Sequence, residues 1–193
     1  MVVRRENGQV RKPATDLPPA VRLSGIDKWF GGAHALRSVS VTFESGLVHA
    51  VAGENGAGKS TLMKILAGVI PASDYSGTLE IDGVPQRLHS IREAERHGIF
   101  LVPQELHVVP ELRVGEFMYL NREPQRFGLV DTKKLWSDTA HWLKVFNLQA
   151  SPLARMEELS THEQQLISIA RAMTQGVKLL ILDEPTSSLT EPE

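Results

Sequence analysis

Residues 53 to 61 constrain the fold of this chain most strongly, because they have the sequence Gly-Glu-Asn-Gly-Ala-Gly-Lys-Ser-Thr. They match the phosphate-loop pattern G-x-x-x-x-G-K-S/T through Gly53, Gly58, Lys59 and Ser60. Glycines let the backbone turn its N–H groups towards one centre, and a following helix adds its positive N-terminus. Because such a loop joins a strand to a helix, it predicts an α/β fold that binds phosphate.

The residues on both sides of the loop have the expected patterns. Val48 to Ala52 is an apolar run, which we predict to be a buried strand, and Leu62, Ile65, Leu66 and Val69 recur at helical spacing. In this setting the lysine can reach the β- and γ-phosphates, and the serine hydroxyl can bind Mg²⁺. A glycine-rich turn without a ligand is the alternative, and it is disfavoured because every required position is filled.

A second motif follows an apolar run near the end of the sequence. Val177 to Leu182 is expected to be a central strand of a parallel sheet, and it leads directly into Asp183 and Glu184. Ligands of open α/β folds bind at the carboxyl edge of the sheet, where these acids would lie. Asp183 is then placed to hold Mg²⁺, and Glu184 to orient or deprotonate a water molecule. The alternative is a strand end with two acids, but the upstream phosphate loop favours the catalytic interpretation.

Gln104 lies two residues after another apolar strand, predicted over Ile99 to Val102. A neutral amide at a strand end can coordinate Mg²⁺ or water. A surface glutamine is the alternative, and the position between the two phosphate-site motifs favours the functional interpretation.

The sequence leaves the role of two further places open. Ser160 and Glu163 have the spacing of a capping box, and the same helix end could bind a γ-phosphate. Phe30, before Gly31 and Gly32, could stack on an adenine or belong to the core.

Composition limits the class of protein. The chain has 193 residues, of which 41% are hydrophobic, and it suits one soluble domain with a subdomain. A net charge of −2 provides no basic field for nucleic acid, and the absence of cysteine excludes disulfides. We find no apolar stretch of about 18 residues and no N-terminal signal segment, so we expect a cytoplasmic protein.

Periodicity predicts the remaining elements. Residues 1 to 20 are expected to form a disordered tail, and residues 21 to 193 the folded domain. Val21 to Trp29 predicts a strand, and alternation of Val39, Val41 and Phe43 predicts another. These strands indicate an antiparallel edge beside a parallel core. Asp82-Gly83 indicates a turn, and a short helix is expected from a Ser90 cap to Gly98.

Residues 110 to 172 are expected to form an inserted helical subdomain. One helix is predicted around Val114 to Leu120, and a second around Leu135 to Phe146. A third begins near Ser160, and its expected apolar stripe comprises Leu166, Ile169, Ala170 and Met173.

The motifs, in this order, resemble those of ATP-binding cassette (ABC) proteins, and among these the ATPase subunits of ribose, galactose and xylose importers. The resemblance extends over nearly all of residues 21 to 193. Its motifs are GENGAGKST at 53–61, VPQEL at 102–106, LSTHEQQ at 159–165, LLILDEP at 179–185 and SSLT at 187–190. It implies a P-loop NTPase core with an antiparallel β edge and an inserted helical subdomain, incomplete at the C-terminus.

The resemblance also implies residue roles. Glu184 and Gln104 would be catalytic, Ser60, Gln104 and Asp183 would hold Mg²⁺, and Ser160 would contact ATP on an opposite cassette. Phe30 would stack on adenine, and the phosphates would be bound by Gly53, Glu54, Asn55, Gly56, Ala57, Gly58, Lys59, Ser60 and Thr61.

The partners implied are a second cassette in the same or another chain, transmembrane permease subunits and, indirectly, a sugar-binding protein, at the cytoplasmic face of the membrane. No nucleic acid is implied. Two departures weaken the match, because Thr161, His162 and Glu163 replace the usual Gly-Gly-Gln and the sequence ends before the family's switch histidine. One alternative is therefore a cassette that binds ATP without hydrolysing it alone. Another is a soluble ABC protein of translation or DNA repair, which the lack of a long coiled-coil insertion disfavours.

Overall fold

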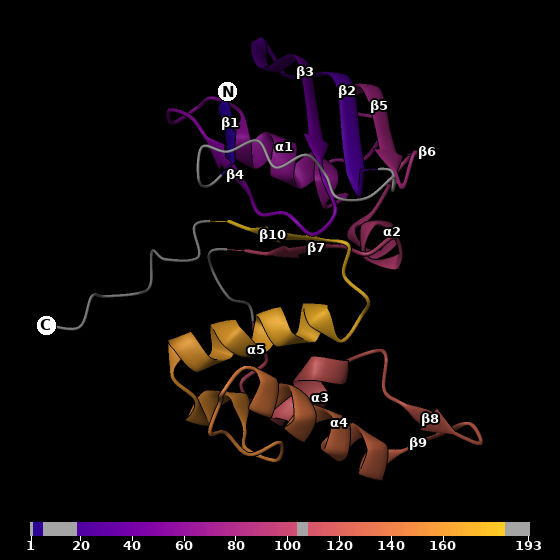
Figure 1. Ribbon diagram of the computed structural model, residues 1–193, viewed down its shortest axis with the longest axis vertical. Coiled ribbons are helices and arrows are strands. Elements are labelled where there is room, and N and C mark those ends of the chain that lie inside the picture. Colours follow the sequence, from indigo (N-terminus) through magenta and orange to yellow (C-terminus); the bar gives the residue numbers. More distant parts are fainter. Residues whose placement is uncertain (1, 6–18, 104–107, 184–193) are drawn as a thin grey trace, which may run out of the picture. The chain divides into compact units, whose positions relative to one another are not determined.

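The chain forms two compact units in the computed structural model (Figure 1). The first consists of Met1–Leu101 with Lys178–Ile181, and the second of Val102–Val177 with the residues from Leu182 onwards. The first unit contains most of the strands, and the second contains three of the helices. The structure describes residues 2–5, 19–103 and 108–183.

A four-stranded antiparallel sheet is the main feature of the first unit. Its strand order is β3-β2-β5-β6, which confirms the predicted antiparallel edge. Asp82 and Gly83 both have positive φ, of 51° and 76°, and form the predicted turn between the last two strands. The strands are β2 (Val21–Phe30), β3 (Ala33–Phe43), β5 (Ser76–Ile81) and β6 (Val84–Gln86).

Helix α1 (Lys59–Leu66) begins at the phosphate loop and packs with this sheet. Its side chains Leu62 and Ile65 are fully buried and share one hydrophobic cluster with Leu23 of β2 and Leu79 of β5. Burying each such side chain stabilises the fold by about 1.5–3 kcal/mol relative to leaving it exposed. The helix is confirmed, although the last residue of its predicted pattern lies beyond its end and is exposed.

The strand before the phosphate loop is shorter and more exposed than we predicted. β4 (His49–Ala52) pairs antiparallel with β1 (Val2–Arg5), and within the described residues it has no other strand partner. The prediction of a disordered tail over residues 1 to 20 was therefore wrong at Val2–Arg5, because this strand depends on pairing with a segment more than 40 positions away. Val48 is 75% exposed, and only Val51 packs against the core. The strand predicted over Val48 to Ala52 is present from His49, but the prediction that it is buried was wrong, because apolar composition does not show which neighbours cover a strand.

The short helix α2 (Ile91–Arg96) has the capping predicted from its sequence. The Ser90 hydroxyl accepts a hydrogen bond from the Glu93 backbone N–H, and the Glu93 carboxylate accepts one from the backbone N–H of His89. Gly98, with φ of +85°, ends the helix as expected.

A parallel strand pair follows. β7 (Ile99–Val102) lies beside β10 (Leu179–Leu182). The N–H of Leu179 bonds to the Gly98 carbonyl, and farther along the N–H of Asp183 bonds to the Val102 carbonyl. Because both partners advance in the same direction, the two strands run parallel, as predicted.

The second unit is built around three helices (Figure 1). Fully buried Met118, Met156, Ile167 and Ala170 belong to its hydrophobic core. A Cβ on Gly115 would lie 2.6 Å from the Trp136 ring, so a glycine is needed where the first two helices meet. The three helices are α3 (Val114–Tyr119), α4 (Thr132–Val145) and α5 (Thr161–Met173), and the 3₁₀ turn η1 (Met156–Glu158) precedes α5.

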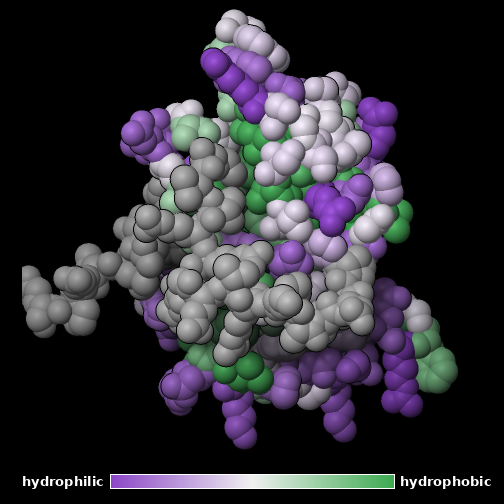
Figure 2. Space-filling model, turned by 45° about the horizontal axis from the view of Figure 1, so that its top comes forward, coloured by the Kyte–Doolittle hydropathy of each residue, from purple (hydrophilic) through white to green (hydrophobic). Residues whose placement is uncertain are grey.

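A two-stranded hairpin between α3 and α4 was not predicted. β8 (Gln125–Arg126) and β9 (Leu129–Val130) are joined by Phe127 and Gly128, both with positive φ. Strands of two residues are too short for their alternation to be detected. Phe127 is 93% exposed. Figure 2 shows one face of the molecule, on which hydrophobic (green) residues lie among hydrophilic (purple) ones.

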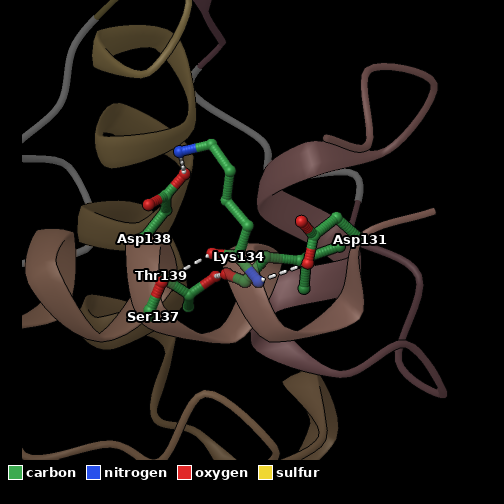
Figure 3. A network of polar contacts seen from close by, with 6 residues as sticks. Asp131, Lys134, Ser137, Asp138 and Thr139 are labelled. Carbon is green, nitrogen blue, oxygen red and sulfur yellow. Dashed lines mark hydrogen bonds and ion pairs between the residues drawn. The ribbon is translucent and has the colours of Figure 1, made fainter. Parts of the chain in front are cut away.

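Polar contacts along α4 stabilise it from its first turn (Figure 3). The Asp131 carboxylate caps the helix by accepting a hydrogen bond of 2.9 Å from the Lys134 backbone N–H. The Lys134 ammonium pairs with Asp138 one turn later at 2.8 Å, and the buried Thr139 hydroxyl donates to a carbonyl one turn earlier. Such exposed pairs contribute little individually, whereas a cap is worth about 1 kcal/mol.

Helix α5 is confirmed, but its buried face differs from the predicted stripe. Within its own unit the helix buries Ile167 and Ala170, whereas Leu166 and Ile169 are only partly buried and Met173 is 39% exposed. The helix itself carries apolar side chains on more than one of its faces, so periodicity could not identify the face that packs.

Within the described residues no helix combines the length and the apolar composition that a membrane crossing requires.

Candidate functional site

The predicted phosphate loop wraps around the ammonium group of its own lysine. Lys59 Nζ donates hydrogen bonds to the carbonyl oxygens of Gly53 at 2.8 Å and Glu54 at 3.0 Å. The backbone N–H of Ala57 bonds to the same Glu54 carbonyl at 3.1 Å and closes a turn within the loop. The loop therefore holds a positive charge at the start of α1 and is itself exposed to solvent.

Gly58 attaches this loop to the neighbouring sheet. It is the N-cap of α1, with φ of +87°, in the left-handed region that favours glycine. A Cβ at this position would lie 2.5 Å from the Ala35 carbonyl oxygen and 2.7 Å from the Leu36 side chain. Both conformation and space thus require glycine, and β3 sets where the loop lies.

The first turn of α1 offers unused donors to an anion. The first backbone bond of the helix runs from the Leu62 N–H to the Gly58 carbonyl at 2.9 Å. Within the described residues, the N–H groups of Lys59, Ser60 and Thr61 have no acceptor. These donors, the helix dipole and the lysine charge all favour a bound phosphate.

The aromatic hairpin tip of the same unit is exposed. Phe30 is 50% exposed, so the alternative that it is a core aromatic is wrong. Trp29 is 55% exposed and stacks on His34 with ring centroids 3.9 Å apart. The His34 ring is in turn hydrogen-bonded to Asp27 at 2.8 Å.

The start of α5 forms a complete capping box. The Glu163 carboxylate accepts hydrogen bonds from the Ser160 hydroxyl at 2.7 Å and from the Ser160 backbone N–H at 2.9 Å. The Ser160 hydroxyl also accepts from the Glu163 N–H at 3.3 Å. These bonds, above all that from the hydroxyl, lower the pKa of Glu163 below its usual value near 4.5. A carboxylate thus occupies the hydroxyl and the backbone N–H of Ser160, while Thr161 and His162 are exposed.

The remaining predicted residues are only partly within the described structure. Asp183 follows β10, and its N–H bonds to the Val102 carbonyl at 3.3 Å. Gln104 and Glu184 lie outside the described residues. The first unit brings the phosphate loop and Phe30 into one body, whereas Ser160 and Asp183 belong to the second unit.

The donor types suit Mg²⁺. Ser60 offers an exposed hydroxyl and Asp183 a carboxylate, and Mg²⁺ prefers such hard oxygen ligands. Within the described residues, three or more His, Cys, Asp or Glu side chains nowhere gather as a protein-only metal site.

One residue near the hairpin escaped the sequence analysis. Lys28 is only 7% exposed, and its ammonium lies 4.7 Å from the centre of the Phe30 ring. The available signal was a lysine two residues before an aromatic side chain, on a strand whose other buried positions, Val21, Leu23 and Ile26, are apolar.

Residues 36–187 match the family model described as ABC transporter. The chain is 43% identical over 173 residues to a xylose import ATP-binding protein of Moorella thermoacetica, a match that covers 90% of this chain and 34% of that protein. It is 47% identical over 169 residues to a ribose import ATP-binding protein of Rhodopirellula baltica, covering 87% and 33%. The chain thus spans about a third of the length of these relatives.

Solved structures share the fold. The ADP conformation of an ATP-binding cassette of an ABC transporter superposes with a TM-score of 0.69 at 23% identity, covering 89% of this chain and 71% of that one. A component of the cbiONQ ABC transporter complex of Clostridium perfringens superposes with a TM-score of 0.73 at 23% identity, covering 90% and 68%. The predicted nucleotide-binding fold with its antiparallel β edge and helical insertion is confirmed.

Proposed function

We propose, on the premise that this chain belongs to the ABC transporter family, that it binds ATP and, in its complete assembly, hydrolyses it to drive import of a monosaccharide. One observation carries the proposal. The loop from Gly53 wraps the Lys59 ammonium beside three unused N–H donors at the start of α1. This combination of charge, dipole and backbone donors suits the β- and γ-phosphates of a nucleotide.

On binding, Lys59 would exchange its carbonyl partners for phosphate oxygens. Charge-assisted hydrogen bonds to phosphate are stronger than those to neutral carbonyls, so the exchange favours the bound state. Gly53 to Thr61 would supply backbone contacts, and Phe30 would stack on the adenine. The preformed shape of the loop, imposed by Gly58 against β3, means that little conformational entropy is lost on binding.

The hydrolytic roles rest on sequence position. Ser60, Gln104 and Asp183 would hold Mg²⁺, which neutralises phosphate charge when it is bound. Glu184 would orient or deprotonate the attacking water, and Gln104 would assist it.

The partners follow from the family and from the relatives' names. We propose that Ser160 contacts ATP bound to a second cassette, that permease subunits bind the helical unit and the region near Gln104, and that a sugar-binding protein acts through them. The assembly would place the chain at the cytoplasmic face of the membrane. Relatives named for xylose, ribose and galactose import support a monosaccharide as cargo.

Binding can be tested by calorimetric titration of the chain with Mg-ATP. Lys59→Ala removes a charged hydrogen-bond donor worth about 1.5–3 kcal/mol, so affinity should fall by about ten- to a hundredfold. Lys64→Ala, an exposed lysine on the same helix, is the matched control and should bind normally. Equal affinity in both variants would contradict the site.

Turnover is tested separately in the complete assembly. Glu184→Gln should abolish most ATPase activity while ATP binding is retained. Normal turnover in this variant would refute the catalytic assignment. If the isolated chain binds ATP but does not hydrolyse it, it is an ATP-binding module whose turnover depends on its partners.

A further inference from the structure

Lys28 is a buried charge inside the antiparallel sheet of the first unit. It lies on β2, on the same side as Phe30, and it is 7% exposed. A buried ammonium is costly unless its hydrogen bonds are satisfied. Lys28 Nζ donates to the Asp74 carbonyl oxygen at 2.7 Å, and the Asp74 carboxylate lies 3.9 Å away.

The same ammonium also faces an aromatic ring. Its nitrogen lies 4.7 Å from the centroid of Phe30, which is within the range of a cation–π interaction. Phe30 is nevertheless 50% exposed, so the lysine covers only part of the side chain. The ring therefore has a cation on one side and surface available to a ligand.

The segment that holds Lys28 follows the phosphate-loop helix. Asp74 closes a turn by donating its backbone N–H to Pro71 at 2.9 Å, and Ala72 bonds to the Leu88 carbonyl at 2.8 Å. This turn comes eight residues or fewer after the end of α1. Lys28 thus connects the aromatic hairpin to the segment that leaves the phosphate site, while Gly58 contacts β3 from the other end of α1.

We propose that Lys28 is a positioning residue that fixes the Phe30 ring and polarises it for a purine base. The inference rests on the proposed nucleotide binding. A cation against one ring face draws electron density from it, and this strengthens stacking of an electron-rich adenine on the exposed face. The purely structural alternative is that Lys28 only ties β2 to the turn at Asp74. In the positioning role, loss of the Lys28 charge weakens only the binding of the base. In the structural role, it weakens the binding of the base and of the phosphates alike.

The test compares ATP with inorganic tripolyphosphate, which lacks the base, by calorimetry on the full chain. Lys28→Gln removes the charge but keeps a donor for the Asp74 carbonyl, and Lys28→Arg keeps the charge. We expect Lys28→Gln to weaken ATP binding about three- to tenfold, with tripolyphosphate affinity unchanged within about twofold. Lys28→Arg should bind ATP like the parent.

Phe30→Leu completes a double-mutant cycle at an exposed position that tolerates substitution. It should remove the advantage of ATP over tripolyphosphate, and adding Lys28→Gln to it should weaken ATP binding no further. Should Lys28→Gln fail to fold, Phe30→Leu with Lys28→Arg still decides the matter, because ATP affinity unaffected by Phe30→Leu overturns the inference.

Two further outcomes would separate a structural role of Lys28 from a failure of the proposed nucleotide site. Equal loss of ATP and tripolyphosphate binding in Lys28→Gln, or additive effects of the two substitutions, would show a structural role and overturn the inference alone. If the parent binds neither ligand, the proposed nucleotide site itself is wrong, and the inference falls with it.

Discussion

The carboxylate of Glu163 accepts hydrogen bonds from both the hydroxyl and the backbone N–H of Ser160, at 2.7 and 2.9 Å. The Glu163 carboxylate therefore engages both donors of Ser160, while within the described residues the first N–H groups of α5, those of Thr161 and His162, have no acceptor. In the proposed assembly a γ-phosphate bound at this helix end would lie beside the carboxylate. A phosphate that used the Ser160 hydroxyl would also have to displace the carboxylate oxygen.

Glu163→Gln should favour ATP use by the complete assembly. A neutral amide oxygen can still accept from Ser160, but it does not repel a phosphate. We expect the KM for ATP to fall by about twofold or more, in line with removal of one like charge near a surface site. Steady-state ATPase assays measure it, with Glu158→Gln, an exposed acid nearby, as control. An unchanged KM would mean that Glu163 does not oppose the phosphate.

The capping box should also make stability depend on acid pH. Glu163 has a lowered pKa in the folded state, so the unfolded chain binds its proton more readily. Its contribution to the free energy of unfolding is present above about pH 4.5 and is lost as the pH falls through the lower folded pKa. Urea unfolding between pH 3 and 7 should show the parent more stable than Glu163→Ala at neutral pH, with the difference shrinking below pH 4.5. A difference independent of pH would contradict this account.

Two loop glycines provide a matched pair. Gly56 and Gly58 both have positive φ, of 82° and 87°, but only Gly58 is against other backbone. Gly56→Ala should cost about 1–2 kcal/mol through left-handed strain alone. Gly58→Ala adds a clash with the Ala35 carbonyl, so it should cost more and should also weaken ATP binding. Denaturant unfolding and calorimetry test both, and equal costs would show that the contact with β3 does not matter.

The polar contacts of α4 should differ in value. Asp131→Ala removes the N-cap and should lower the free energy of unfolding by about 1 kcal/mol. Asp138→Ala removes a pair in which lysine precedes the acid, the weaker orientation, and should cost less than about 0.5 kcal/mol. Chemical denaturation of the two variants ranks them, and the reverse order would contradict the assignment of the cap.

Features determined by neighbours in sequence could be predicted. The turn at Asp82-Gly83 and the Ser90 and Ser160 caps depend on residues at most three positions apart, and all three are present. The phosphate loop likewise carries its conformational requirement in its own glycines.

Features determined by distant residues could not. Whether Val48 is covered, and which face of α5 packs, depend on elements elsewhere in the chain. Lys28 meets Asp74 across 46 positions, a pairing to which no spacing rule applies. The hairpin at Phe127 escaped for another reason, because its strands are too short to show alternation.

The contact between Gly58 and the Ala35 carbonyl bears on protein engineering. A nine-residue loop followed by a helix invites transfer, as a self-contained segment, to the strand–helix junction of another protein. Here, however, the backbone oxygen of Ala35, 23 positions upstream, leaves no room for a side chain at position 58 of the loop. A graft of residues 53 to 66 alone would lack the β3 segment against which Gly58 packs. To keep the loop in its present conformation, the graft must also include Ala35 and Leu36.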